Sequence, residues 1–181
     1  MKTVLLIALC FTTSALLAAD EPYEITDILT ANSPSASRST DWKPGEGIAL
    51  EVSGMDWTAD GKLAVAIRKG EVWLLDGALG PPDKVKYKLF ASGLHEPLGL
   101  LRDGDSLLVT QRTEMTRLRD TNHDGVADEY LTAGRGWNVS GAYHGYAYGP
   151  RRDGRGNLWV ALNVDMGDRS NNKTGWRGWA G

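Results

Sequence analysis

One hairpin-like pattern occurs three times in this chain. In each copy a short apolar segment leads to a turn, and a second apolar run follows; the turns are Asp60-Gly61, Asp103-Gly104 and Asp153-Gly154. Glycine takes positive φ readily, so each copy is typical of a β-hairpin. The turn aspartates are 43 and 50 residues apart, a period that suits about four strands per repeat. The repeat therefore predicts an all-β chain of stacked four-stranded units, which is a β-propeller.

Each repeat is expected to form one propeller blade, over 52–90, 97–131 and 145–181. The predicted strands of the first two blades are 52–57, 63–67, 71–75, 86–90, 98–101, 107–110, 115–119 and 127–131. In the third, a run over 146–148 is expected to end at Gly149-Pro150, because proline cannot donate to a strand ladder. A second strand is expected over 158–162. About two and a half blades is fewer than a closed propeller contains, so we expect the N-terminal part of a longer protein.

The first 19 residues have the layout of a secretory signal peptide. Lys2 precedes an apolar run from Val4 to Leu17, and Ala18-Ala19 follows. Such a segment is too short for a membrane span, so we expect a secreted or periplasmic protein with no span in its mature chain. Residues 20–47, rich in Ser, Pro and Gly, are expected to be a lead-in with little regular structure, and 48–181 to be the propeller domain.

Charge and cysteine content exclude several function classes. The 20 basic and 23 acidic residues give a net charge of −3, and removal of Lys2 would make it −4. Nucleic acid is therefore not an expected partner. Cys10, the only cysteine, lies in the predicted signal peptide, so the mature chain would have no disulfide and no thiolate nucleophile.

Residues 120–128, DTNHDGVAD, are the most specific local signal for a ligand. Asp120, Asn122 and Asp124 stand at positions 1, 3 and 5 of a calcium loop, the Val126 carbonyl at position 7 and Asp128 at position 9. Glycine at position 6 permits the sharp turn, and hard oxygen ligands suit calcium. Position 12 is leucine rather than the bidentate glutamate of an EF-hand, and the flanks are typical of strands. The alternative is an ordinary hairpin tip, where Asp, Asn and Gly are also common.

Two further residues are candidates for chemistry. His144 begins an inner-strand segment beside three tyrosines, and an imidazole titrates near neutral pH, so it is the candidate catalytic base. A histidine that only forms structural hydrogen bonds or lines a channel is the alternative. Arg112 ends a strand and is the candidate cofactor-binding residue, since guanidinium binds carboxylates in a bidentate manner; a surface ion pair is its alternative.

Several of these segments resemble one known family. The segment 94–100 (LHEPLGL), with Asp103-Gly104 and 107–112 (LLVTQR), resembles a blade of the glucose/sorbosone dehydrogenase family of six-bladed propellers, as do 145–150 (GYAYGP) and 156–160 (GNLWV). Arg119 to Asp128 and Trp176 to Trp179 are similar to segments of the large secreted dehydrogenase-like proteins of planctomycetes and their relatives. The resemblance covers residues 47–181.

The resemblance implies a quinone-dependent oxidoreductase. In sugar-oxidising members the propeller holds pyrroloquinoline quinone with calcium, and a histidine takes the proton from the sugar hydroxyl; His144 would be its counterpart here, or would line the substrate mouth. The expected substrate is a small sugar or alcohol, and the expected partners are the remaining blades or a haem domain. The alternative function is that of a noncatalytic, calcium-stabilised propeller that binds carbohydrate or a protein partner. On either reading this chain alone is expected to be inactive.

Overall fold

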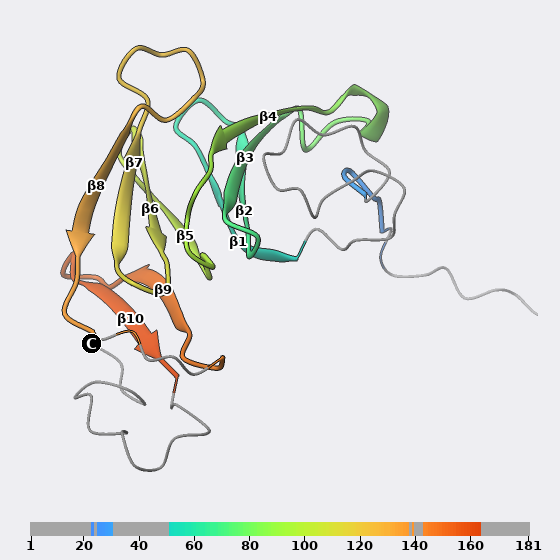
Figure 1. Ribbon diagram of the computed structural model, residues 1–181. Helices are drawn as coiled ribbons and strands as arrows, with labels where there is room; N and C mark the ends of the chain where they lie inside the picture. The colour runs from blue at the N-terminus through green and yellow to red at the C-terminus, as the bar shows by residue number, and fades with distance from the viewer. Residues whose placement is uncertain (1–22, 24, 31–50, 138, 140–142, 164–181) are drawn as a thin grey trace, which may run out of the picture.

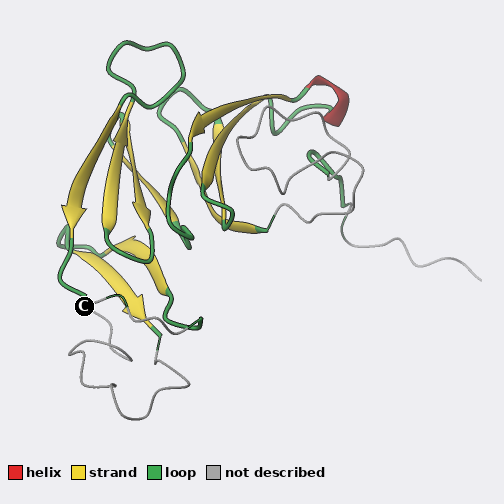
Figure 2. Ribbon diagram, viewed as in Figure 1, coloured by secondary structure: helices red, strands yellow, loops and turns green. Residues whose placement is uncertain are grey.

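The computed structural model describes residues 23, 25–30, 51–137, 139 and 143–163. Within them the chain forms three antiparallel sheets and one short 3₁₀ helix, η1 (Pro82–Lys84), as Figure 2 shows. The predicted signal peptide, most of the lead-in, the end of the third predicted blade and the Trp176 to Trp179 segment lie outside the described residues. No helix of the described residues is long and apolar enough to cross a membrane.

The first two sheets have four strands each, in sequence order. They comprise β1 (Val52–Trp57), β2 (Leu63–Ile67), β3 (Glu71–Asp76) and β4 (Lys86–Ala91), and then β5 (Leu100–Asp103), β6 (Ser106–Thr110), β7 (Met115–Arg119) and β8 (Glu129–Gly134). The third sheet pairs β9 (Ala147–Arg152) with β10 (Leu158–Leu162). The all-β prediction is confirmed. None of the three sheets closes on itself within the described part of the chain.

Alternation along the central strands explains how the sheets stack. Successive side chains of a strand point to opposite faces, and in β2 Ala64 and Ala66 join the core shared with the second sheet, whereas Val65 and Ile67 join a separate core. That separate core includes Trp73 and Leu75 and is partly covered by Ile28 and Leu29. Both faces of the first sheet are therefore buried, which explains why β2 reads LAVAI with no polar residue.

The sheets meet through their first strands. β1 packs against β5, and β9 packs against β5 and β6; Figure 1 shows the three sheets as separate groups of strands that adjoin there. At the contact one glycine from each repeat packs on the next: a Cβ on Gly54 would lie 2.6 Å from the Leu100 nitrogen, and one on Gly99 would lie 1.9 Å from the Gly149 carbonyl oxygen. The backbones themselves touch, so no side chain fits between them.

Several strand boundaries differ from the prediction; β5, for example, covers Leu100–Asp103 rather than 98–101. Two of the differences have a structural explanation. Strand β9 does not end at Gly149-Pro150 but continues to Arg152, because a register shift opposite Trp159 and Ala161 removes the need for a ladder hydrogen bond at the proline. Strand β8 begins at Glu129, two residues later than expected. The amide of Ala127 instead donates to the Phe90 carbonyl of β4 at 2.8 Å, so this part of the chain is tied to the first sheet.

Candidate functional site

Three equivalent positions gather at the end of the sheets where the first strands begin. Glu51, Glu96 and Tyr146 each stand three residues before one of the packed glycines. Both glutamates have positive φ, 49° and 45°, a conformation that costs free energy for a residue with a Cβ. The repeat therefore directs one polar side chain from every sheet toward the same region.

Arginines from the neighbouring turns link these glutamates into one row of alternating charge. Arg68 Nε donates to Glu51 at 2.7 Å, and its Nη1 donates to Glu96 at 3.0 Å. The other carboxylate oxygen of Glu96 lies 3.3 Å from Arg112 Nε. The side chains are mostly shielded, with 13% of Arg112 and 22% of Glu96 exposed. We call Glu51, Arg68, Glu96 and Arg112 the ion-pair row; the hydrogen bond to Glu51 raises the pKa of Arg68.

Arg112 is already engaged by its own chain. Besides Glu96, its guanidinium donates to the Tyr143 carbonyl and lies 5.2 Å from the centre of the Tyr146 ring, within cation–π range. The structure thus shows an ion pair between Arg112 and Glu96, and both side chains are mostly shielded. Arg112 as a cofactor-binding residue, and pyrroloquinoline quinone as the cofactor, stay predictions.

Tyr143, His144, Tyr146 and Tyr148 form a chain of edge-to-face rings beside the row, which we call the aromatic cluster. Ring centres are 5.1 Å apart for Tyr143 and His144, 6.1 Å for Tyr143 and Tyr146, and 6.2 Å for Tyr146 and Tyr148. Tyr143 is 64% and Tyr148 40% exposed, and His144 is exposed. Burial raises the pKa of Tyr146, with a smaller contribution from its hydrogen bond with Tyr143.

Backbone bonds hold the aromatic cluster in place. The Tyr146 amide donates to the His144 carbonyl at 2.8 Å, and Asn163, which follows β10, donates from its side chain to the same carbonyl and from its amide to the Tyr146 carbonyl. The structure therefore brings the two sequence-predicted residues His144 and Arg112 together through a shared neighbour, Tyr146.

The predicted calcium loop lies at the opposite end of β7, between that strand and β8. Asp120 accepts from the amides of Asp124 and Gly125 at 3.1 and 2.7 Å. Asp128 accepts from the amide and hydroxyl of Thr121, and these bonds lower its pKa. The loop is also tied to the first sheet, because Lys88 donates to the Asp124 carbonyl.

The fit of this loop to calcium is partial. Carboxylate and amide oxygens are the right donors, and oxygens that accept one backbone hydrogen bond keep a second lone pair. Among the described residues, however, no three acidic or histidine side chains converge closely enough to hold a metal ion. Calcium at Asp120, Asn122, Asp124, Val126 and Asp128 stays a prediction.

Sequence reasoning missed Glu51, Arg68 and Glu96. The signal was present, since both glutamates keep a fixed spacing from the repeated glycine, but nothing in the sequence alone shows that an arginine from the next turn reaches them. Comparison of the chain with protein families, with curated proteins and with solved structures found no match.

Proposed function

We propose that the three sheets are successive blades of a β-propeller and that the chain binds a sugar or a related polyol on the aromatic cluster. The observation that carries this proposal is the set of exposed rings next to a shielded row of charges. The apolar face of a sugar ring packs on aromatic side chains, while hydroxyls pair with polar groups at the edge. Tyr143, Tyr148 and His144 supply rings and hydrogen-bonding groups on one exposed surface.

The ion-pair row supports binding by fixing the platform. Arg112 contacts both Tyr143 and Tyr146 and is itself held by Glu96. A preorganised site loses less conformational freedom when the ligand binds. The row therefore acts in positioning the rings, and the ligand contacts the rings rather than the arginines.

Titration with mono- and oligosaccharides tests the proposal, followed by calorimetry and by chemical-shift changes of the tyrosine rings. Tyr143→Ala is expected to weaken sugar binding by roughly tenfold, the effect of losing about 1.4 kcal/mol. Tyr130→Ala removes an equally large, 44% exposed ring from β8 and serves as the matched control. Equal affinity of the two variants, or absence of binding by the parent chain, would contradict the proposal.

Oxidation of the bound sugar or alcohol is the second candidate, favoured by the exposed imidazole of His144 beside the rings. His144 would accept the hydroxyl proton while the hydride from the carbon passes to an electron acceptor, either a quinone or the added dye. Dye reduction in the presence of sugar tests this candidate. Loss of reduction with retained binding in His144→Ala would support oxidation, whereas binding without any reduction by the parent chain would leave binding as the function.

A further inference from the structure

The third sheet departs from the first at the ion-pair row. The Arg68 amide donates to the Glu51 carbonyl at 3.0 Å, and the Asn163 amide donates to the Tyr146 carbonyl at 2.9 Å. Asn163 therefore takes the place of Arg68 in the repeat, and Tyr146 takes that of Glu51. Acid and arginine are exchanged together for neutral residues, so neither charge is left without a partner. Repeats depart from their own pattern most often at functional sites.

The side chain of Asn163 turns back to the loop that precedes its own sheet. Its Nδ2 donates to the His144 carbonyl at 3.2 Å, whereas Arg68 extends to Glu96 of the next sheet. A carbonyl can only accept, so the NH₂ group of the amide must face His144, and the amide oxygen faces the other way. The half-buried side chain therefore presents an acceptor with a fixed direction.

This acceptor lies at the edge of the aromatic cluster. Asn163 is bonded to the backbone carbonyls of both His144 and Tyr146, and the rings of these two residues are 6.5 Å apart. A sugar that packs its apolar face on the rings keeps its hydroxyls at the edge of that contact. An amide oxygen at this edge can accept a hydrogen bond from one of them.

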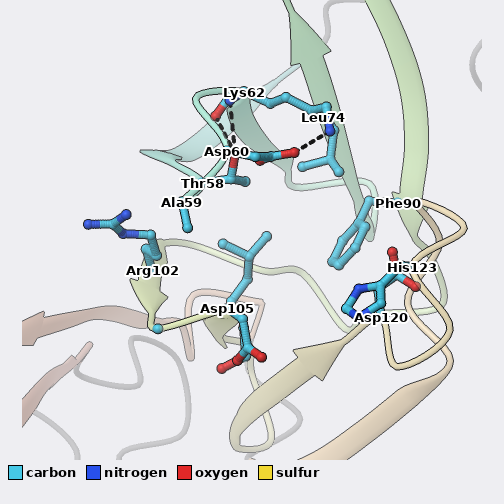
Figure 3. A pocket seen from close by; sticks show the side chains of 13 residues that line it. Thr58, Ala59, Asp60, Lys62, Leu74, Phe90, Arg102, Asp105, Asp120 and His123 are labelled. Atoms are coloured by element: carbon cyan, nitrogen blue, oxygen red, sulfur yellow. Dashed lines mark hydrogen bonds and ion pairs between the residues drawn. The ribbon is translucent and has the colours of Figure 1, made fainter.

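In the cleft between the first two sheets, by contrast, polar groups are engaged with one another. The cleft measures about 260 Å³, and Figure 3 shows Asp60 and Lys62 together on one side of it. Lys62 is bonded to Asp60 and is also attracted by Asp120, and the Thr58 hydroxyl donates to Asp60 at 2.5 Å. A sugar hydroxyl would have to break these pairs, which favours recognition at Asn163.

We propose that the amide oxygen of Asn163 accepts a hydrogen bond from one hydroxyl of a hexopyranose packed on the aromatic cluster, and that Asn163 thereby determines which sugars bind. The inference rests on the proposed function. A sugar that lacks this hydroxyl, or carries it on the other side of the ring, leaves the amide oxygen without a donor. Asn163 therefore separates sugars that bury the same apolar area, which the rings alone cannot do.

Methyl β-D-glucopyranoside and its monodeoxy analogues test the assignment by calorimetric titration of the full chain. Asn163→Ala is expected to weaken binding of the glycoside about fivefold, through the loss of one hydrogen bond. One monodeoxy analogue should bind the parent chain and Asn163→Ala equally, because it lacks the donor. Asn157→Ala removes a side-chain donor to Asp153 at the other end of β10 and is the matched control, with an unchanged affinity expected.

A second readout needs no variant. The side-chain NH₂ resonances of Asn163 should shift when the glycoside is added to the parent chain, while those of Asn157 stay in place. Unmoved Asn163 resonances on binding, or an equal loss of affinity for every analogue in Asn163→Ala, would overturn the inference. Binding that depends on Tyr143 but not on Asn163 would also overturn it and leave the proposed function standing. Absence of binding by all the glycosides would contradict both.

Discussion

Gly99 lies so close to Gly149 that a Cβ added to Gly99 would stand 1.9 Å from the Gly149 carbonyl oxygen. The contact joins the second and third sheets through backbone alone, and Gly54 makes the equivalent approach to Gly99. The glycine of each repeat is thus required by the neighbouring sheet, in addition to any requirement of its own turn.

Gly99→Ala is expected to separate the second and third sheets. A methyl group cannot be accommodated without moving the backbone, and the φ of 151° at Gly99 disfavours a side chain in any case. We expect a loss of more than about 4 kcal/mol in the free energy of unfolding, measured by urea denaturation. The control is Gly154→Ala, where nothing lies within 4 Å of the new methyl group. Equal stability of the two variants would contradict the backbone contact.

Glu96→Gln is expected to destabilise the protein by about 1 to 2 kcal/mol, since two shielded arginines would each lose a charged acceptor. Glu129→Gln breaks a more exposed pair, with 44% of Arg119 and 40% of Glu129 accessible, and is expected to cost less than about 0.5 kcal/mol. Denaturant titration of both variants checks the difference. A larger loss of stability in Glu129→Gln than in Glu96→Gln would show that the shielded ion-pair row does not stabilise the fold more than an exposed ion pair does.

Asp153 is expected to make the third sheet sensitive to acid. Hydrogen bonds from the side chains of Asn157 and Trp159 lower its pKa well below the usual 3.8. Its stabilising contribution is therefore complete above about pH 4 and is lost as the pH falls through the lowered pKa. We expect Trp159 fluorescence to change in this acid range.

The matched variant for that experiment is Asp153→Asn. Its amide would direct N–H groups at two donors, so it should lower the melting temperature at pH 7, and the difference from the parent chain should shrink as Asp153 becomes protonated. A difference that grows on acidification would contradict the assignment.

Calcium is expected to raise the melting temperature of the chain after chelator treatment, because cation binding to the folded loop alone stabilises the folded state. Asp124→Ala should remove that increase. Asp83→Ala, outside the loop, should retain it. No shift in the parent chain on adding calcium would refute the metal site.

Much of the strand pattern was predictable from sequence because it is local. Central strands such as Leu63–Ile67 and Ser106–Thr110 consist almost entirely of buried residues, and Asp-Gly turns mark where the chain reverses. Strand β9 was cut short in the prediction because Pro150 ends a regular ladder, whereas the register shift in the third sheet accommodates it.

The candidate site was less predictable because it depends on contacts between repeats. His144 and Arg112 were identified from residue type and position, but Arg112 was expected to be available to a cofactor. Its engagement by Glu96 depends on how the second sheet presents a residue that has positive φ. The spacing of Glu51, Glu96 and Tyr146 from the glycines was visible in the sequence. That these three positions lie in one region, however, follows only from how the sheets pack.

The contacts between β4 and the 120–128 loop affect which part of the molecule unfolds first. The first two sheets are fastened both at their inner glycines and at this outer edge, through Lys88 with Asp124 and Phe90 with Ala127. The third sheet meets its neighbour mainly through β9, which packs on β5 and β6. Under gentle proteolysis the first two sheets should survive together as one protected core, while amide exchange should be fastest in the third.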